Sequence, residues 1–235
     1  MSSAKLFHSF FQKEPSITTS AHGRVNLIGE HTDYNNGFVL PSLIPQSLHV
    51  SISLRDDDKI IGISSEFGEL QSSITSSNDG TWLDFVRGAI YFCQKISPSL
   101  KGIEVAVSSS IPSGSGLSSS AALEIALLRA ITQLKDISIH SQEMAKIGQQ
   151  IEHQFVGTQC GIMDQIASAC GTFGQVIFLD CENLQTKFMP VFLQHSFVII
   201  HSGSTRKLSH GKYNERKNET SKASEILEVP SLRHA

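Results

Sequence analysis

Cysteine is scarce in this sequence, and no pair of cysteines has a spacing typical of a metal site. The four cysteines form no C-x-x-C motif, and they are Cys93, Cys160, Cys170 and Cys181. The first residues also lack the apolar core of a secretory signal peptide. A disulfide framework is therefore not indicated, and a reducing cytoplasm is the expected compartment.

A long apolar run and an excess of positive charge are also missing. The longest apolar runs, such as residues 197–200, are too short to cross a bilayer. The formal net charge is -3 and the isoelectric point is near 6.4, which argues against an electrostatic nucleic-acid surface. The ten histidines contain no H-E-x-x-H pair. We therefore expect no nucleic acid or membrane as partner, and no zinc site.

The sequence has the length and composition of a folded protein, with 235 residues of which 40% are hydrophobic. Helical spacing predicts helices over residues 4–13, 81–96 and 142–155, the last ended by Gly157, and composition predicts another over 219–227. Alternation predicts a half-buried strand at 102–107 and a hairpin of 48–54 with 60–63. Short apolar runs predict strands at 176–179 and 197–200, with a third at 187–189. This irregular order favours an α+β domain over a doubly wound sheet.

Residues 112–122, with the sequence PSGSGLSSSAA, are the most informative stretch. They lie between a predicted strand and a run of helix formers that begins with serines able to cap a helix. Gly114 and Gly116 allow a tight turn, and the N-terminus of a helix attracts anions. The string is neither a Walker A loop nor a dinucleotide G-x-G-x-x-G motif. By itself it fits a phosphate cradle and an ordinary connector equally well.

A second polar stretch, GRVNLIGEHTDYN at residues 23–35, places one cation, two carboxylates and a histidine around a short apolar centre. Donors and acceptors at this density suit a sugar, because each of its vicinal hydroxyls requires one donor and one acceptor. The alternative is a capped turn with a surface ion pair between Arg24 and either Glu30 or Asp33. Few turns need so many polar groups, so we favour a sugar site.

With both stretches in hand, the sequence resembles the GHMP family of small-molecule kinases, and within it the galactokinases. Residues 23–35 resemble the amino-terminal galactokinase signature, and residues 112–122 resemble the family's nucleotide-phosphate loop. A third string, CGIMDQ at residues 160–165, resembles the segment that bears the catalytic aspartate. The resemblance runs from about residue 15 to residue 233. It implies an enzyme that phosphorylates the C1 hydroxyl of galactose with ATP and Mg²⁺, giving galactose 1-phosphate.

The resemblance implies two catalytic residues, Asp164 and Arg24. Asp164 matches the carboxylate that contacts the C1 hydroxyl and is usually assigned as the base, and Arg24 matches its cationic partner. A cation at this position stabilises the developing alkoxide and the phosphoryl group, so we expect positioning and charge neutralisation to matter more than proton abstraction. An alternative role for Asp164 is to cap the helix that follows it.

The resemblance also implies three sets of binding residues. The sugar is expected at Glu30, His31, Thr32, Asp33, Gly161, Asp164 and Tyr213. The nucleotide is expected at Ser65, Trp82, Gly114, Ser115, Gly116, Leu117, Ser118, Ser119 and Ser120. Magnesium is expected at Ser120 and Glu152, because Mg²⁺ prefers few protein ligands together with phosphate oxygens. Without the resemblance, Tyr213 would equally be a packing lid, Glu152 a solvated helix residue and Trp82 part of the core.

The implied fold is α+β, a GHMP kinase amino-terminal domain of the ribosomal protein S5 domain 2-like type, with a mixed sheet packed with helices. This domain is expected at residues 1–200, and residues 201–235 are expected to begin a carboxy-terminal ferredoxin-like domain that is largely absent. We therefore expect the sequence to be the amino-terminal part of a longer design, with a phosphate loop open to water. His22 also departs from the family pattern, since relatives carry proline there.

Three functions stay open for the sequence. The favoured one is the kinase. The second is a galactose and ATP sensor without catalysis, which the intact serine and alanine run at residues 118–122 argues against. The third is an inactive remnant with exposed apolar surface. A related sugar such as N-acetylgalactosamine is also open, and we expect a cytoplasmic monomer whose small-molecule ligands are galactose and ATP.

Overall fold

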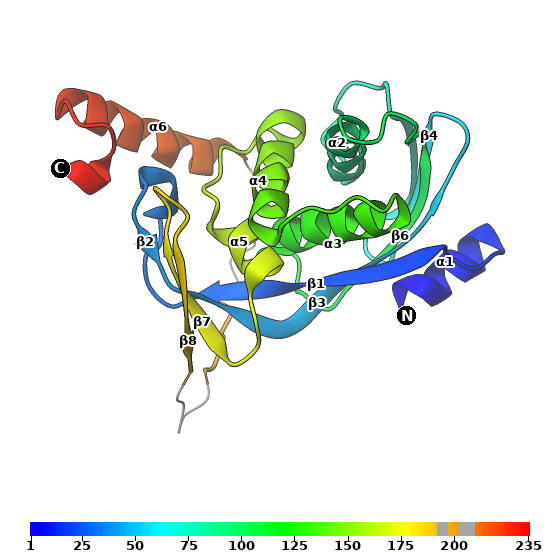
Figure 1. Cartoon of the computed structure of the whole chain (residues 1–235), viewed down its shortest axis with the longest axis horizontal. Helices are drawn as coiled ribbons and strands as arrows, with labels where there is room; N and C mark the ends of the chain where they lie inside the picture. The colour runs from blue at the N-terminus through cyan, green and yellow to red at the C-terminus, as the bar shows by residue number, and fades with distance from the viewer. Residues whose placement is uncertain (192–196, 202–209) are drawn as a thin grey trace.

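The chain folds around one mixed sheet with helices packed against it (Figure 1), which confirms the predicted α+β class. The computed structural model describes residues 1–191, 197–201 and 210–235. The strands are β1 (Ile17–Asn26), β2 (Phe38–Val39), β3 (Pro41–Leu54), β4 (Lys59–Ser64), β5 (Gly68–Ser73), β6 (Ile103–Ser109), β7 (Gln175–Asp180) and β8 (Thr186–Pro190). Their order is β2-β7-β3-β6-β4-β5, with β1 paired to β3 and β8 paired to β7.

The helices gather mainly on one side of the β1–β3 pair (Figure 1). They are α1 (Ser3–Phe11), α2 (Leu83–Gln94), α3 (Ser119–Leu134), α4 (Ser141–Ile151), α5 (Met163–Cys170) and α6 (His210–Ile226). Three short helical segments complete the fold: the 3₁₀ turns η1 (Asp33–Asn35) and η3 (Leu232–His234), and the π turn η2 (Glu152–Val156). The helices predicted at 4–13, 81–96 and 142–155 are confirmed, and Gly157 ends the third in a left-handed conformation with φ 84°.

The predicted hairpin of residues 48–54 with 60–63 is wrong. β6 lies between these two segments, antiparallel to β3 and parallel to β4, and the hairpin partner of β4 is β5. β6 is also not half-buried as predicted, because its residues from Ile103 to Ser108 are all buried. A central strand has neighbours on both edges, and here α1 also packs against it. Alternation of apolar residues identifies a strand but does not identify its partners.

The core joins the sheet to α2 and α3. α3 is buried along most of its length, and its alanines at 121, 122, 126 and 130 allow close packing on β1. Two polar contacts fix this packing: Thr19 Oγ1 donates to the carbonyl of Ala126 at 2.7 Å, and Arg129 Nη1 donates to the carbonyl of Ser20 at 2.7 Å. These contacts hold α3 so that its N-terminus meets the end of β1.

The strand predicted at residues 197–200 is wrong. These residues are described without strand pairing and are exposed, with Val198 at 79% and Ile200 at 84%. An apolar run of strand length becomes a strand only when a sheet edge pairs with it, and none of the described strands does so. The strands predicted at 176–179 and 187–189 are confirmed as β7 and β8.

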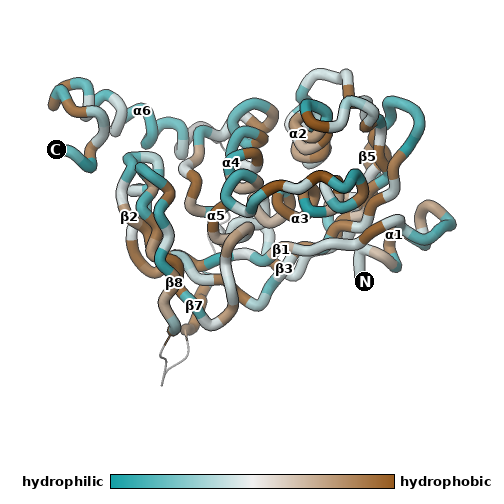
Figure 2. Tube along the Cα trace, viewed as in Figure 1, coloured by the Kyte–Doolittle hydropathy of each residue, from teal (hydrophilic) through white to brown (hydrophobic). Residues whose placement is uncertain are grey.

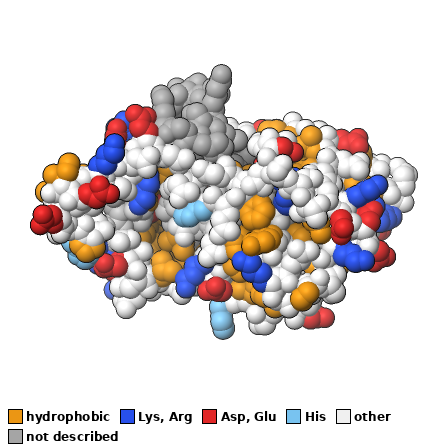
Figure 3. Space-filling view, turned by 90° about the horizontal axis from the view of Figure 1, so that it is seen from above, with side chains coloured by type: hydrophobic (Ala, Val, Ile, Leu, Met, Phe, Trp, Pro, Cys, Tyr) orange, Lys and Arg blue, Asp and Glu red, His pale blue; other side chains and the backbone are white. Residues whose placement is uncertain are grey.

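The helix predicted at 219–227 is confirmed but longer, because α6 begins at His210. It is hydrophilic along most of its length (Figure 2). Seen from above (Figure 3), charged side chains gather mostly toward the two ends of the molecule, with apolar ones between them. Among the residues that the structure describes, no helix is long and apolar enough to cross a membrane.

Candidate functional site

A cavity of about 630 Å³ lies where β1, the loop before α3, the start of α5 and α6 meet. This volume falls within the usual range for small-molecule sites. Most of the predicted site residues line it: Arg24, Glu30, His31, Asp33, Ser65, Trp82, Gly114, Gly116, Ser118, Ser119, Ser120, Glu152, Gly161, Asp164 and Tyr213. Thr32, Ser115 and Leu117 do not. The fold therefore brings segments from many separate parts of the chain to one space.

An ion pair between Arg24 and Asp164 stands at the centre of the cavity wall. Arg24 Nε and Nη2 both contact Asp164 Oδ1, at 2.8 and 2.6 Å. Arg24 Nη1 donates to the carbonyl of Gly116 at 2.7 Å, and its backbone N–H donates to that of Leu117. Arg24 is 9% exposed, so the alternative of a surface ion pair with Glu30 or Asp33 is wrong. One buried cation thus joins β1, the phosphate-loop segment and α5.

The position of Arg24 depends on a local irregularity of β1. The register between β1 and β3 shifts between His22 and Arg24, as in a β-bulge that re-aims the following side chain. Gly23 lies at this shift, and a Cβ on it would lie 2.5 Å from the carbonyl oxygen of Leu117. A side chain at this position would push the loop at 112–122 away from β1.

Ser118 contacts the other oxygen of the same carboxylate. Its Oγ donates to Asp164 Oδ2 at 2.7 Å, and it precedes α3 without capping it. The expectation that a serine caps this helix is therefore wrong for Ser118. The alternative that Asp164 caps α5 is also wrong, since Asp164 lies in the first turn and Ile162 is the cap residue. Both residues instead direct their side chains toward each other, which leaves the helix N–H groups available to a ligand.

The loop at residues 112–122 has the backbone of an anion site. Gly114, Gly116 and Ser118 have φ of 65°, 75° and 63°, a region that glycine adopts readily. Ser115 Oγ donates to the carbonyl of Pro112 at 2.6 Å, which closes the turn and explains why Ser115 does not face the cavity. The loop leads directly into the 16-residue helix α3, whose N-terminus presents backbone donors and a positive dipole end.

A second loop, residues 27–37, forms another part of the cavity wall and is called the N-terminal loop below. Thr32 closes it from within: its Oγ1 donates to the carbonyls of Gly29 and Phe38, both at 2.7 Å. Thr32, predicted to bind the sugar, therefore serves the turn and does not line the cavity. Glu30, His31 and Asp33 from the same loop do line it.

Asp33 and Gly161 meet in the wall of the cavity. Asp33 is 8% exposed, and burial together with the charge of Asp164 raises its pKa to about 7. A Cβ on Gly161 would lie 2.0 Å from Asp33 Oδ2, so only glycine allows this approach. The backbone N–H of Gly161 points to Tyr213 Oη at 3.4 Å. Asp33, Gly161 and Tyr213 are thus brought together from three distant segments.

α6 places Tyr213 with the help of residues that the sequence did not single out. The ring of Tyr213 packs against that of Tyr34 with centroids 5.3 Å apart, and Tyr34 Oη contacts His31 Nδ1 at 2.6 Å. Lys217 Nζ donates to the carbonyl of Tyr34 at 2.6 Å. Asn214 binds the backbone of the 157–159 turn. Tyr34 lies inside the signature string, and Lys217 is one helical turn beyond Tyr213, so spacing could have identified both.

A pair of buried carboxylates comes from α3 and η2. Glu152, from η2, is 8% exposed, and burial raises its pKa to about 7. Glu124, from α3, is fully buried, and burial followed by the charge of Glu152 raises its pKa. Gln165 Nε2 donates to Glu124 Oε2 at 3.1 Å. Glu124 was not predicted; an acidic residue on an otherwise apolar helix was the available signal.

Ser120 and Glu152 both face the cavity, as the predicted magnesium ligands require. The described residues contain no cluster of three or more His, Cys, Asp or Glu side chains that could hold a metal. Mg²⁺ does not need such a cluster when phosphate oxygens and water supply its other ligands. A buried carboxylate and a serine hydroxyl that line the same cavity are oxygen donors of the kind that a hard cation takes.

Ser65 and Trp82 also line the cavity. The Trp82 ring packs on Gly62, where a Cβ would lie 2.4 Å from the ring. The buried Nε1 of Trp82 has no hydrogen-bond partner among the residues that the structure describes. Trp82 precedes α2, and the next turn holds a buried pair, Asp84 and Arg87, that was not predicted. Asp84 also accepts from the backbone N–H of Gly80 at 2.8 Å. This pair therefore fixes the loop that carries Trp82.

Two family models match the chain. Residues 5–54 match the galactokinase galactose-binding signature, and residues 84–172 match the GHMP kinases N terminal domain. The structure of galactokinase from Lactococcus lactis, complexed with galactose, superposes with a TM-score of 0.85 and 30% identity over 99% of this chain. The chain therefore carries a GHMP kinase N-terminal domain together with the galactokinase galactose-binding signature. The resemblance read from the three sequence strings is confirmed, as is the GHMP kinase N-terminal fold.

Other solved structures share the fold of this chain at lower identity. A D-glycero-D-manno-heptose 1-phosphate kinase from Bacteroides thetaiotaomicron is 19% identical with a TM-score of 0.64, covering 75% of this chain and 60% of its own. The mevalonate kinase of Methanococcus jannaschii is 20% identical with a TM-score of 0.61, covering 74% and 55%. The chain spans 63% of the length of the Lactococcus galactokinase.

Proposed function

We propose that this chain forms the sugar site and the triphosphate site of an ATP-dependent galactokinase, which transfers the γ-phosphoryl group of ATP to the C1 hydroxyl of galactose. One observation carries the proposal. The carboxylate of Asp164 is held on one oxygen by Arg24, from the galactose-signature segment, and on the other by Ser118, from the glycine and serine loop. The same side chain therefore stands at the boundary between a sugar site and a phosphate site.

The sugar side of the cavity supplies acceptors and donors in one place. The Asp33 carboxylate accepts hydrogen bonds from two adjacent sugar hydroxyls, and Glu30 and His31 contact the remaining ones. Tyr213 covers the sugar from α6. These roles are supported by the position of all four residues on the cavity wall and by the match to the galactose-binding signature. A buried polar site of this kind rejects sugars that lack the matching hydroxyl.

The phosphate side fits a triphosphate. The N–H groups at the start of α3 and in the glycine turn bind phosphate oxygens, and Ser120 with Glu152 would hold Mg²⁺, which neutralises charge on the transferred group. Asp164 orients the C1 hydroxyl and accepts its proton, while Arg24 stabilises the charge that develops on the oxygen. Most of the catalytic effect then comes from positioning two ligands against each other.

Measurement of ADP release with galactose and Mg-ATP tests the proposal. Asp164→Asn is expected to lower turnover at least about 100-fold while galactose still binds. Asp136→Asn, an exposed aspartate in the turn after α3, is the matched control and is expected to leave turnover unchanged. Full turnover in Asp164→Asn would contradict the role of Asp164. Binding of galactose and ATP by the wild-type protein without ADP release would contradict the kinase and favour a sensor.

A further inference from the structure

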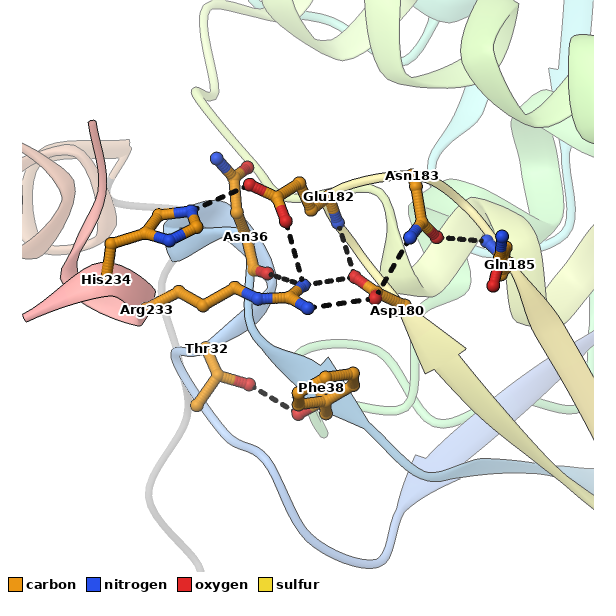
Figure 4. A network of polar contacts seen from close by, with 9 residues as sticks. All are labelled: Thr32, Asn36, Phe38, Asp180, Glu182, Asn183, Gln185, Arg233 and His234. Carbon is orange, nitrogen blue, oxygen red and sulfur yellow. Dashed lines mark hydrogen bonds and ion pairs between the residues drawn. The ribbon is translucent and has the colours of Figure 1, made fainter.

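An ionic cluster outside the cavity ties the last residues of the chain to the N-terminal loop (Figure 4). Arg233, in η3, forms a bidentate pair with Asp180, in which Nη2 contacts Oδ2 at 3.0 Å. Its Nη1 donates to the backbone carbonyl of Asn36 at 2.9 Å and lies 3.4 Å from Glu182 Oε2. The guanidinium group also lies 4.4 Å from the centre of the Phe38 ring. We call Arg233, Asp180, Glu182 and the Asn36 carbonyl the Arg233 clamp.

The clamp closes on the loop that carries the proposed sugar-binding residues. Asn36 adopts a left-handed conformation with φ 60°, immediately after η1, which contains Asp33. On the other side, the N–H of Cys181 donates to the carbonyl of Gly37 at 3.0 Å. The end of β7 and the Arg233 side chain therefore hold consecutive peptide groups of the loop. Both contacts use backbone carbonyls, so they fix the path of the chain at this point.

α6 is fastened to the same loop by a second contact. Lys217 Nζ donates to the carbonyl of Tyr34, which is the residue next to Asp33. α6 is hydrophilic along most of its length, so its place depends on polar contacts such as that of Lys217 more than on an apolar face. The Arg233 clamp lies beyond the C-terminal end of α6, and Tyr213 lies near its start. The Arg233 clamp is thus connected to both segments around Asp33, the N-terminal loop and α6.

We propose that Arg233 is a positioning residue for the sugar site: its clamp on Asp180 and the Asn36 carbonyl fixes the N-terminal loop and α6 so that Asp33 and Tyr213 are preorganised for the sugar. This inference rests on the proposed function. Arg233 does not line the cavity, so it acts through the loop and not by contact with a ligand.

The geometry of the clamp requires arginine. Three acceptors, the two Asp180 oxygens and the Asn36 carbonyl, surround one planar group with several fixed donors. A lysine ammonium is a compact charge on a flexible stem and cannot reproduce the planar two-point contact. Arg233→Lys therefore keeps the charge and removes the geometry, which separates positioning from electrostatic attraction.

Galactose affinity, ATP affinity and backbone exchange in the full chain test the inference. Arg233→Lys is expected to weaken galactose binding about 10-fold or more, because small displacements of positioning groups have large effects, while ATP binding changes less than about 2-fold. Amide hydrogen exchange of residues 32–37 is expected to become faster without ligand and to return toward the wild-type rate at saturating galactose. Asp180→Asn keeps the shape of the acceptor and is expected to weaken galactose binding and to speed loop exchange to a smaller extent. This variant replaces Arg233→Lys in the test if Arg233→Lys does not fold.

Arg55 offers a matched control. It forms a bidentate pair with Asp57, at 2.7 Å for both contacts, and also contacts Glu104, but it touches no residue of the N-terminal loop. Arg55→Lys is expected to leave galactose affinity and loop exchange unchanged. Absence of galactose binding by the wild-type chain would overturn the proposed function. If the wild-type protein binds galactose and Arg233→Lys shows the same galactose affinity and the same loop exchange, this inference alone would be overturned.

Discussion

Gly161 and Asp33 approach each other so closely that a methyl group on Gly161 would lie 2.0 Å from Asp33 Oδ2. Real side chains do not tolerate such a contact, and the atom that would be displaced belongs to the carboxylate proposed to bind the sugar. The two residues are separated by more than half of the chain, yet both line one cavity.

Gly161→Ala is expected to weaken galactose binding more than about 10-fold, because Asp33 must rotate away from its sugar-facing position. ATP affinity is expected to change little. Isothermal titration with each ligand measures both effects. Gly174→Ala is a suitable control, since its Cβ meets no atom within 4 Å and its φ of 76° costs about 1 kcal/mol of stability without disturbing the cavity. Equal galactose affinities for Gly161→Ala and the wild-type protein would contradict the prediction.

Galactose binding is expected to strengthen as the pH rises from 6 to 8. The pKa of Asp33 is raised to about 7 without ligand, mainly by burial, so a large part of the population is protonated at pH 6. Sugar hydroxyls that donate to the carboxylate favour its ionised form, so binding releases a proton.

Titrations in buffers of different ionisation enthalpy measure this proton release directly. Asp33→Asn has no titratable group at position 33, so it is expected to bind galactose more weakly and without proton release from this site. Measurement without ATP and Mg²⁺ separates Asp33 from Glu152, whose pKa is also raised to about 7. Galactose affinity that is constant from pH 6 to 8 would contradict the assignment of Asp33.

The buried pair of Asp84 and Arg87 is expected to be essential for stability. Their side chains are 1% and 2% exposed, and Arg87 also donates to Ser72 Oγ at 2.7 Å. Arg87→Ala leaves a buried carboxylate without its partner, which costs about 3–5 kcal/mol. The same substitution at Arg216, whose contact with Glu219 is half exposed, is expected to cost less than about 1 kcal/mol. Urea denaturation of the two variants measures the difference; similar losses would show that burial does not decide the effect.

Much of the candidate site could be predicted from short strings. The glycine turn at 112–122, the polar density of 23–35 and the aspartate of 160–165 are local features, and local backbone preferences allow each to be recognised alone. The resemblance to the GHMP kinases followed from the order of these three strings. Of the predicted residues, Thr32 and Ser115 face away from the cavity because each uses its hydroxyl to close its own turn.

The contacts of other residues could not be predicted in this way, because each contact joins segments that lie far apart in the sequence. Gln165 contacts Glu124, which lies 41 residues earlier in the sequence, and Lys217 contacts Tyr34, which lies 183 residues earlier. Strand partners were missed for the same reason. Residues 60–63 look like the return of a hairpin, yet β6 takes the place beside β3.

The sequence by itself determined which segments turn, which form helices and which carry the charged groups of the GHMP kinase motifs, since these depend on neighbouring residues. Only the tertiary structure decided which oxygen of Asp164 meets Arg24 and which meets Ser118, why Gly161 must be glycine, and how Arg233 closes on the N-terminal loop. Such contacts depend on distances of a few ångströms between segments far apart in the chain, and packing of the whole core around β3 and α3 sets those distances.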